Sequence, residues 1–152
     1  MSRREFPGHP LVGVGGVVIS DGRVLLVRRG AAPLEGEWSI PGGLLEVGET
    51  LIAGVRRELL EETAIEVRVL ELVDVFERIN LDVSGKARYH FVVLDYLCEA
   101  RSGQARAGSD VTHVAWAARQ ELERYSLSEA ATRVILRAFE MMRERGISRQ
   151  AD

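Results

Sequence analysis

The stretch that decides the fold runs from Gly43 to Ile65 and reads GLLEVGETLIAGVRRELLEETAI. Within it, residues 50–62 carry an apolar side chain at every fourth position, namely Leu51, Val55 and Leu59. Arginine and glutamate fill most of the other positions towards the end of this segment. Such a repeat places one apolar stripe on a helix and leaves the remaining surface polar. The sequence therefore predicts an amphipathic helix over 50–62, with Thr50 or Glu49 capping its start.

Three glutamates lie together near the end of this helix. Glu58, Glu61 and Glu62 occupy positions i, i+3 and i+4, so their carboxylates share one face. Like charges at this spacing repel, and the C-terminal end of a helix is itself negative. A hard cation such as Mg²⁺ would compensate the charge, because it prefers oxygen ligands. Taken alone, however, the helix is better explained as an ordinary charged surface with an Arg57–Glu61 ion pair.

The loop before the helix changes this interpretation. Residues 38–43 read WSIPGG, in which two glycines follow an aromatic residue and a proline, as expected where backbone approaches a ligand closely. Polar residues then recur at fixed spacing from Gly43: Glu49 after five intervening residues, Arg57 and Glu58 after seven more, then Glu61 and Glu62, with Ile65 completing the pattern. This pattern resembles the Nudix box. It departs from the box at Ala64, where the family usually has a glycine suited to a left-handed helix C-cap, at a cost of about 1 kcal/mol.

The resemblance implies roles for the residues of the box. Glu58, Glu61 and Glu62 would coordinate magnesium or manganese, to which the backbone carbonyl of Gly43 would contribute. Arg57 would pair with Glu49 and orient the site. Such a metal would activate a water that attacks phosphorus. The group that deprotonates this water stays open between Glu58, Glu61 and Asp110, the last of which lies in a later loop.

The rest of the chain predicts a mixed sheet between helices. A strand hairpin is expected over 11–19 and 23–29, joined by the turn dipeptide Asp21-Gly22. Further strands are expected over 65–79, 87–100 and 111–117, with turns and loops between them. A last helix is expected from the cap Ser128 to a stop at Gly146. Strands and helices without strict alternation indicate an α+β protein, and the resemblance implies the Nudix fold, an α/β/α sandwich with a central mixed sheet.

Length and composition limit the class of protein. The chain has 152 residues, a net charge of -3 and a single cysteine, Cys98. We expect a single Nudix hydrolase domain over 11–147, an N-terminal lead over 1–10 and a C-terminal tail over 148–152. One cysteine allows no internal disulfide, which fits a cytoplasmic protein. The charge argues against polymeric nucleic acid as a partner, and no segment meets the requirements of a membrane span.

Several residues outside the helix are candidates for substrate binding. Arg28 and Arg29 end the second strand, where one guanidinium could donate two hydrogen bonds to a phosphate. Because side chains alternate along a strand, the other arginine would point away from the site. Glu46 and Asp110 are further candidates, although each is also common as a turn residue. Aromatic and imidazole side chains in the strands are more often core residues than ligands, and we expect this of His90, His113, Tyr96 and Trp116. Trp38 is expected to anchor the loop.

The substrate is less well defined than the reaction. The resemblance implies hydrolysis of the phosphoanhydride bond of a nucleoside diphosphate linked to another moiety, such as a nucleoside triphosphate or a nucleotide sugar like ADP-ribose. The ADP-ribose subgroup commonly has a proline after the box, but no proline follows Pro41 here. The alternative is a catalytically inactive Nudix-fold module that binds nucleotide or regulates. Nudix enzymes are often dimers, so a homodimer stays open.

Overall fold

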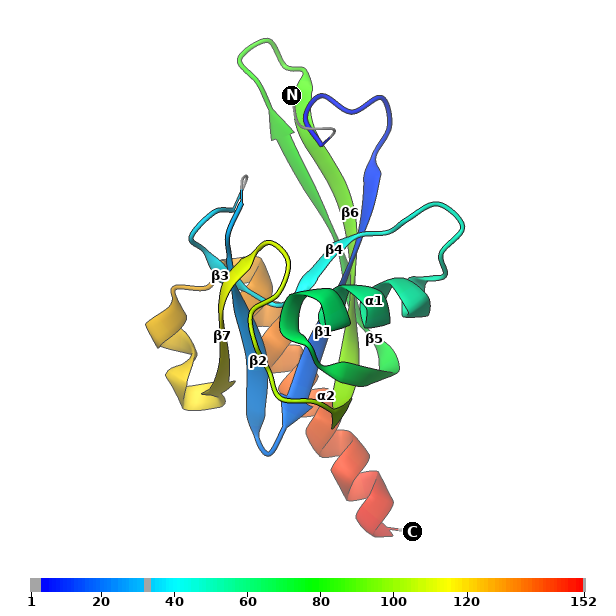
Figure 1. The fold of residues 1–152 in the computed structure, drawn as a ribbon, viewed down its shortest axis with the longest axis vertical. Helices are drawn as coiled ribbons and strands as arrows, with labels where there is room; N and C mark the ends of the chain where they lie inside the picture. Colours follow the sequence, from blue (N-terminus) through cyan, green and yellow to red (C-terminus); the bar gives the residue numbers. More distant parts are fainter. Residues whose placement is uncertain (1–3, 32–33, 152) are drawn as a thin grey trace.

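The computed structural model describes residues 4–31 and 34–151. Residues 1–3 of the expected lead, Pro33 in the long loop and Asp152 of the expected tail lie outside the described residues. The elements follow one another along the chain (Figure 1) as β1 (Leu11–Ser20), β2 (Arg23–Arg29), β3 (Trp38–Ser39), β4 (Gly42–Leu44), α1 (Leu51–Thr63), β5 (Glu66–Leu81), β6 (Ala87–Ser102), β7 (Val111–Ala118), the 3-10 helix η1 (Arg119–Tyr125) and α2 (Glu129–Ala151).

The strands form one mixed sheet. Their order is β3-β2-β1-β6-β5, with β4 pairing with β1 and β7 pairing with β2 in addition. β1 runs parallel to β6, whereas all the other pairs are antiparallel. The final residues of β1 pair with β2, and its earlier residues lie between β4 and β6. β1 therefore joins the two parts of the sheet, and the predicted mixed sheet is confirmed.

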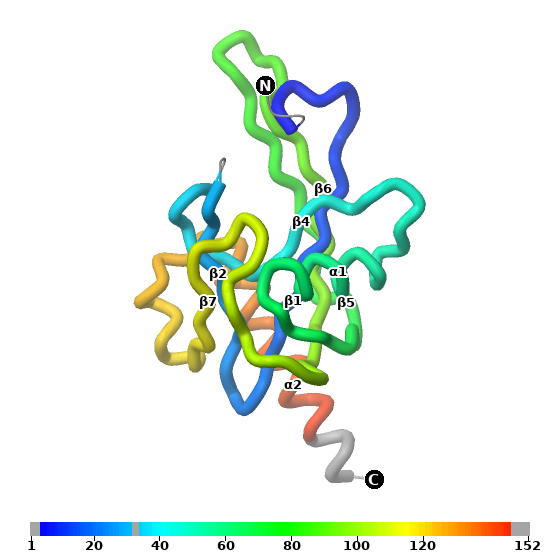
Figure 2. Tube along the Cα trace, in the orientation of Figure 1, coloured from blue at the N-terminus to red at the C-terminus, as the bar shows by residue number. Residues whose placement is uncertain are grey.

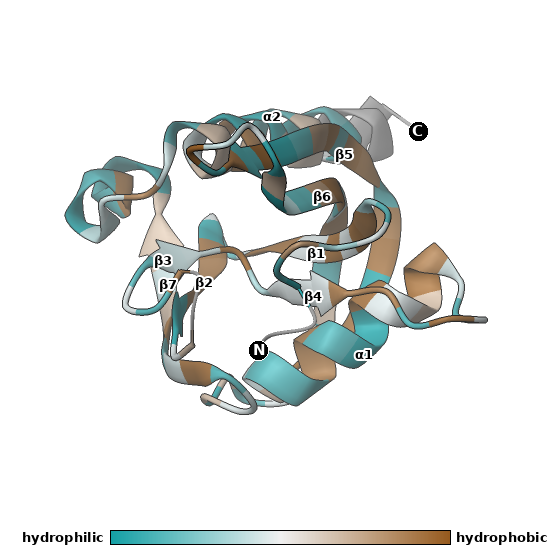
Figure 3. Cartoon of the chain, turned by 90° about the horizontal axis from the view of Figure 1, so that it is seen from above, coloured by the Kyte–Doolittle hydropathy of each residue, from teal (hydrophilic) through white to brown (hydrophobic). Residues whose placement is uncertain are grey.

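One helix covers each face of the sheet (Figure 3). Successive residues of β1 point to opposite faces, and both are fully buried at Val17 and Val18. Val17 belongs to the core beneath α2, which includes Ile135, whereas Val18 belongs to the core beneath α1, which includes Leu59. The α/β/α sandwich and the α+β class are therefore confirmed.

The predicted hairpin and the start of α1 have the expected local chemistry. Asp21 and Gly22 connect β1 to β2 with φ angles of 50° and 74°, the left-handed values that a tight hairpin turn requires. The Thr50 hydroxyl accepts a hydrogen bond from the amide of Ala53 at 3.1 Å and so caps α1. Ala64 ends α1 with φ 62°, the conformation for which the Nudix box usually has glycine.

The last helix begins as expected but ends later. The Ser128 hydroxyl accepts a hydrogen bond from the amide of Ala131 at 3.1 Å and caps α2. The expected stop at Gly146 is wrong, because α2 continues to Ala151. Gly146 is not among the residues with positive φ, so it does not form a left-handed C-cap. A glycine within a helix costs only about 1 kcal/mol, which the helix tolerates here. Within the described residues, neither this helix nor α1 is long and apolar enough to cross a membrane.

The hairpin of β5 and β6 extends beyond the body of the sandwich, at the top of Figure 1. The N-terminal lead lies against it, with the Phe6 amide donating to the Arg88 carbonyl at 2.7 Å. β5 is an edge strand, and its pairing with β6 is interrupted by four register shifts. The strand also exposes several large apolar side chains, namely Leu72, Val75, Ile79 and Leu81.

Candidate active site

The end of α1 brings the three predicted glutamates onto one face, where they differ in exposure. Glu62 is buried, with 4% of its surface exposed, whereas Glu58 is partly buried and Glu61 is exposed. Glu58 and Glu62 lie on the side that the helical periodicity placed near the core, as expected. The exposure of the three carboxylates therefore ranges from buried to exposed within about one turn of helix.

Arg57 joins this cluster to the loop before the helix. Its Nε donates to Glu49 Oε2 at 2.6 Å and its Nη2 to Glu49 Oε1 at 2.9 Å, a two-pronged ion pair. Its Nη2 also donates to the Leu44 carbonyl at 3.1 Å. The hydrogen bonds from Arg57 lower the pKa of Glu49 to about 2, and the same contact raises the pKa of Arg57.

The remaining nitrogen of Arg57 faces the helix carboxylates. Nη1 lies 2.7 Å from Glu58 Oε1 and 3.3 Å from Glu61 Oε2, the latter being the expected i, i+4 pair. Burial raises the pKa of Glu58, and the hydrogen bond from Arg57 opposes this shift. One guanidinium thus contacts three carboxylates and compensates part of their mutual repulsion.

Arg29 holds the most buried carboxylate. Its Nη1 donates to Glu62 Oε2 at 2.7 Å, and its Nη2 donates to the Ile40 carbonyl at 2.9 Å. The other oxygen of Glu62 accepts a hydrogen bond from the Gly42 amide at 2.9 Å. Burial raises the pKa of Glu62, while the charge of Arg29 lowers it. Arg29 and Glu62 together connect β2, the glycine-rich loop and α1.

The two strand-end arginines point in different directions, and of the two Arg29 lines the cavity next to the glutamates. Arg28 turns away and donates to the Gly36 carbonyl at 3.3 Å, beside a separate hollow that also contains His113. The expectation that His113 is a packed core residue is wrong, since it is exposed and lies 6.4 Å, centroid to centroid, from the Trp38 ring. The reason is that β7 pairs only with β2, so this end of the strand lies at the rim of the sheet.

The other aromatic expectations agree with the structure. Tyr96 and Trp116 pack against the core beneath α1. Trp38 packs against the core beneath α2 and meets the Tyr125 ring edge-on at 5.0 Å, so it anchors the loop as expected. His90 is partly buried on β6. Tyr96 and Trp116 are not among the residues that line the cavity next to the glutamates.

The carboxylates of Glu58, Glu61 and Glu62 at the end of α1 would suit a hard cation, because such an ion prefers oxygen ligands. The other expected ligand, the backbone carbonyl of Gly43, belongs to β4, which passes next to Glu58. A Cβ at Gly43 would collide with the Glu58 carboxylate, so the absence of a side chain leaves room for that group. In the described part of the chain, no three acidic, histidine or cysteine side chains converge as ready ligands. The arginines hold these carboxylates instead, and an ion would have to compete with Arg57 for Glu58 and Glu61.

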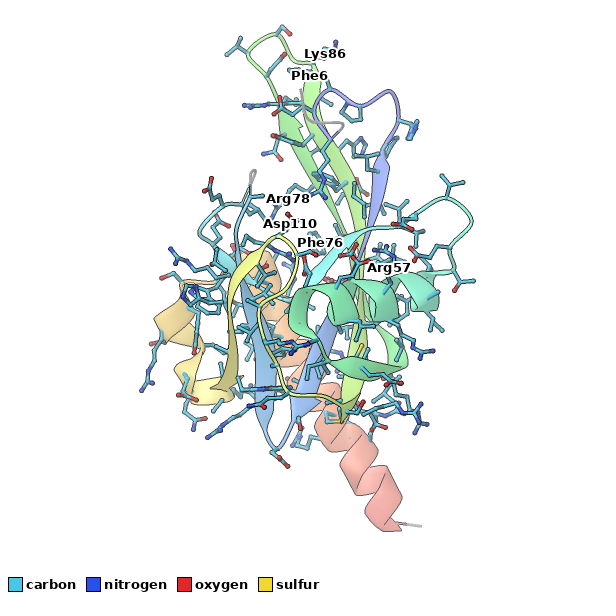
Figure 4. The ribbon with its side chains drawn as sticks, in the orientation of Figure 1. Phe6, Arg57, Phe76, Arg78, Lys86 and Asp110 are labelled. Atoms are coloured by element: carbon cyan, nitrogen blue, oxygen red, sulfur yellow. The ribbon has the colours of Figure 1, made fainter. Side chains whose placement is uncertain are left out.

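The glutamates open onto a cavity of about 440 Å³. Glu58, Glu61 and Glu62 line it, and β5 contributes Phe76 and Arg78 to its lining. Figure 4 labels these two side chains together with Asp110, which lines the same cavity. The volume is that of a pocket for a small molecule. The metal-type donors therefore form the wall of a pocket that could hold an organic ligand.

The loop before β7 is fixed to the end of α1. The amides of Gly108 and Ser109 donate to the carbonyls of Glu62 and Glu61 at 2.9 and 3.1 Å, which satisfies carbonyls that the helix leaves unpaired. Figure 2 shows this loop curling against the helix. Asp110, at φ 59°, lines the cavity, and its carbonyl accepts a hydrogen bond from Gly30 at 2.8 Å. The loop candidate is thus brought to the site.

Glu46 lies farther out. Its side chain is exposed, with Oε1 3.8 Å from Arg57 Nη1, and its amide donates to Glu49 Oε1 at 3.1 Å. It is absent from the lining of the cavity. The contacts link Glu46 to the Arg57–Glu49 pair and leave it away from the pocket interior.

One cavity residue was missed by the sequence reasoning. Asp95 on β6 is 2% exposed and lines the cavity. Burial, with a smaller contribution from the charge of Asp74, raises its pKa to about 7. A signal was present, because Asp95 is the single charged residue in the otherwise apolar run from Phe91 to Cys98. A charged side chain within a buried strand is uncommon unless it has a partner or a function.

Comparison with known proteins agrees with this geometry. The model of the NUDIX domain matches residues 9–139. The chain belongs to the NUDIX hydrolase family. A MutT-like protein from Streptomyces ambofaciens is 36% identical to this NUDIX chain, and the match covers 87% of this chain and 80% of the relative. An ADP-ribose pyrophosphatase from Methanocaldococcus jannaschii is 33% identical over 67% of this chain and 58% of the relative, so the match spans little more than half of that protein.

Solved structures of NUDIX proteins share the fold. The crystal structure of a MutT NUDIX hydrolase from Burkholderia pseudomallei superposes with a TM-score of 0.74 at 31% sequence identity. The superposition covers 85% of this chain and 98% of that protein. The NUDIX assignment therefore holds for sequence and for three-dimensional structure.

Proposed function

We propose that this protein is a metal-dependent pyrophosphohydrolase that cleaves the phosphoanhydride bond of a nucleotide-type substrate. The observation that carries the proposal is the position of the Glu58, Glu61 and Glu62 cluster, held by Arg57 and Arg29 at the wall of a cavity. Membership of the NUDIX hydrolase family supports the reaction class. The complete set of box carboxylates favours an enzyme over an inactive binding or regulatory module.

Each residue of the cluster has a task in this proposal. Glu58, Glu61 and Glu62, with the Gly43 carbonyl, would hold Mg²⁺ or Mn²⁺. When bound, the ion would neutralise phosphate oxygens and lower the pKa of a water molecule. Arg57 acts as the positioning residue, since its contacts to Glu49 and Glu58 fix the helix carboxylates relative to the loop.

A base is needed to take the proton from the attacking water. Glu58 and Glu61 are the candidates on α1, and Asp110 is the candidate on the loop. All three line the cavity, so each could reach a water between the ion and the substrate. Substitution of each in turn would separate them, because loss of the base changes the pH dependence of kcat in addition to its size.

The cavity supports a substrate in which a nucleoside diphosphate carries a further group, as in a nucleoside triphosphate or a nucleotide sugar such as ADP-ribose. The names of the two relatives do not select one substrate class, since one is called MutT-like and the other is an ADP-ribose pyrophosphatase. Arg29 is largely engaged by Glu62 and Ile40, so a phosphate would have to share its guanidinium. A panel of nucleoside triphosphates, nucleotide sugars and dinucleotides, with products identified by mass, would select between these classes.

The proposal is tested by Glu61→Gln and Glu62→Gln, assayed for Mg²⁺-dependent product release from any accepted substrate. Each should reduce kcat by ~100-fold or more, as expected when charge stabilisation of a transition state is lost. Glu61 is the cleaner site, since its exposed side chain has a contact only at the surface. Glu77→Gln, an exposed glutamate of β5, is the matched control and should leave turnover unchanged. Full activity in both active-site variants would exclude the proposed site.

A further inference from the structure

Asp95 is the buried charged group that the proposed reaction does not use. Asp95 is 98% removed from solvent, and the two influences that shift its pKa, burial and the charge of Asp74, both disfavour the carboxylate. Asp74 lies directly opposite in the register of β5 and β6. A buried carboxylate that is not stabilised by its surroundings costs free energy, so a purely structural role does not explain it.

Asp95 lines the cavity beside apolar side chains of the sheet. It lies level with Gly15 on β1, and its Oδ1 occupies the space that a Cβ at Gly15 would need. Val93 on β6 lies level with Gly13, with its Cγ2 3.4 Å from the position of a Cβ at Gly13. Val93 and Phe76 of β5 also line the cavity. Apolar and aromatic neighbours suit a planar ring better than a sugar.

Register also gives the separation between the backbones of Asp95 and Gly42. Gly15 pairs with Gly42 on its other side, and the Gly42 amide is the donor to Glu62. The Asp95 backbone is therefore two strand steps, or ~10 Å at the usual strand separation of ~4.8 Å, from the Gly42 backbone, and its carboxylate reaches over Gly15. A nucleotide with its phosphates at the glutamates would extend across this part of the cavity and place its base near Asp95. The negative charge of Asp95 makes a phosphate at the Asp95 end unfavourable.

We propose that Asp95 reads the base of the bound nucleotide by accepting hydrogen bonds from an exocyclic amino group, so that amino-bearing bases bind in preference to their oxo counterparts. This inference rests on the proposed function and adds a substrate preference to it. Cytosine and adenine present an amino group beside a ring nitrogen, whereas uracil and hypoxanthine present a carbonyl there. A carboxylate oxygen that faces the exocyclic group accepts a hydrogen bond from the amino group and repels the carbonyl.

The protonation of Asp95 is compatible with this recognition. Its pKa is raised to about 7 by burial, so the acid and the carboxylate are both populated near neutral pH. The neutral acid donates one hydrogen bond and accepts another, which matches the ring nitrogen and the amino group of cytosine or adenine. The neutral acid pairs equally well with a carbonyl beside a ring N–H, so the preference for the amino group comes from the ionised form, which repels the carbonyl.

The test measures the binding of matched nucleotide pairs that cannot be hydrolysed. The α,β-methylene analogues of CDP and UDP, and of ADP and IDP, are titrated calorimetrically in Mg²⁺. In each pair that binds, the amino-bearing member should bind about tenfold more tightly, the effect of one hydrogen bond to a charged group. Asp95→Asn should reduce this ratio to less than about twofold, because an amide offers both a donor and an acceptor.

Asp74→Asn is the matched control. It makes the same chemical change at the residue opposite Asp95, but Asp74 does not line the cavity, so the base preference should be retained. Equal affinities within every binding pair of the wild type, or a preference that survives Asp95→Asn, would overturn the inference. Hydrolysis without base preference would leave the proposed function standing. Absence of both hydrolysis and binding across the panel would overturn the inference about Asp95 and the proposed function together.

Discussion

Arg57 donates two parallel hydrogen bonds to Glu49, from Nε at 2.6 Å and from Nη2 at 2.9 Å. Its third nitrogen, Nη1, lies 2.7 Å from Glu58. The same side chain therefore fixes Glu49, two residues before α1, and a carboxylate about two turns along the helix. Because a guanidinium is planar, the position of Glu49 determines the direction from which Arg57 meets Glu58.

Arg57→Lys should reduce kcat by ~10- to 100-fold while keeping the charge, because an ammonium group cannot form the two-pronged contact and hold Glu58 at once. The measurement is kcat at saturating substrate and Mg²⁺. Arg56→Lys is the control: Arg56 is exposed and lies 4.0 Å from Glu66, so its replacement should have no effect. Unchanged kcat in Arg57→Lys would show that charge alone suffices.

Gly43→Ala should lower activity with little change in stability. The added methyl group would collide with the Glu58 carboxylate, which can rotate away and lose its position. A displacement of this size costs up to ~100-fold in turnover, whereas the free energy of unfolding should fall by no more than about 1 kcal/mol. Gly8→Ala, where no atom lies within 4 Å of the new methyl group, should match the wild type in both assays. A Gly43→Ala protein of full activity would contradict the close approach.

Asp95→Asn should change how stability depends on pH. The pKa of Asp95 is 3.8 in the unfolded chain and about 7 in the fold, so ionisation favours the unfolded chain as the pH rises between these values. The wild type should therefore lose stability relative to Asp95→Asn from pH 4 to pH 8, by at most about 4 kcal/mol, and the difference should be constant above that range. Urea unfolding of both proteins across this range measures it. Parallel stability profiles would contradict the raised pKa.

Ala64→Gly should stabilise the protein by about 0.5–1 kcal/mol, because alanine is strained at φ 62° and glycine is not. For a chain of this size the melting temperature should rise by about 2 °C. Ala53→Gly, at an exposed position of the same helix, should have the opposite effect and cost up to about 1 kcal/mol. A loss of stability in both variants would mean that the Ala64 methyl group contributes packing that outweighs its strain.

The sequence reasoning was most successful where the determinants are local. The start of α1 at Thr50, the Asp21-Gly22 turn and the grouping of Glu58, Glu61 and Glu62 all depend on residues within a few positions of one another. The extension of α2 past Gly146 was missed because glycine is compatible with both a helix end and a helix interior, and only the surrounding packing decides between them.

Contacts that depend on sheet pairing could not be predicted in the same way. Arg29 and Glu62 are 33 positions apart, and their ion pair requires the end of β2 to lie beside the end of α1. The exposure of Asp95 to the cavity depends on the parallel pairing of β1 with β6, which places Gly15 next to it. Neither the register nor the neighbouring strand is encoded in a local pattern, because each results from the assembly of the whole sheet.

The free edge of β5 has a consequence for how the protein behaves at high concentration. A strand with a free edge and exposed Leu72, Val75 and Ile79 is a template onto which a second chain could add. The register shifts along β5 and the charged Glu71 and Glu77 among its apolar residues interrupt such a template. Replacing these glutamates with valine should leave the pocket untouched and make this edge prone to pair with the same edge of other chains.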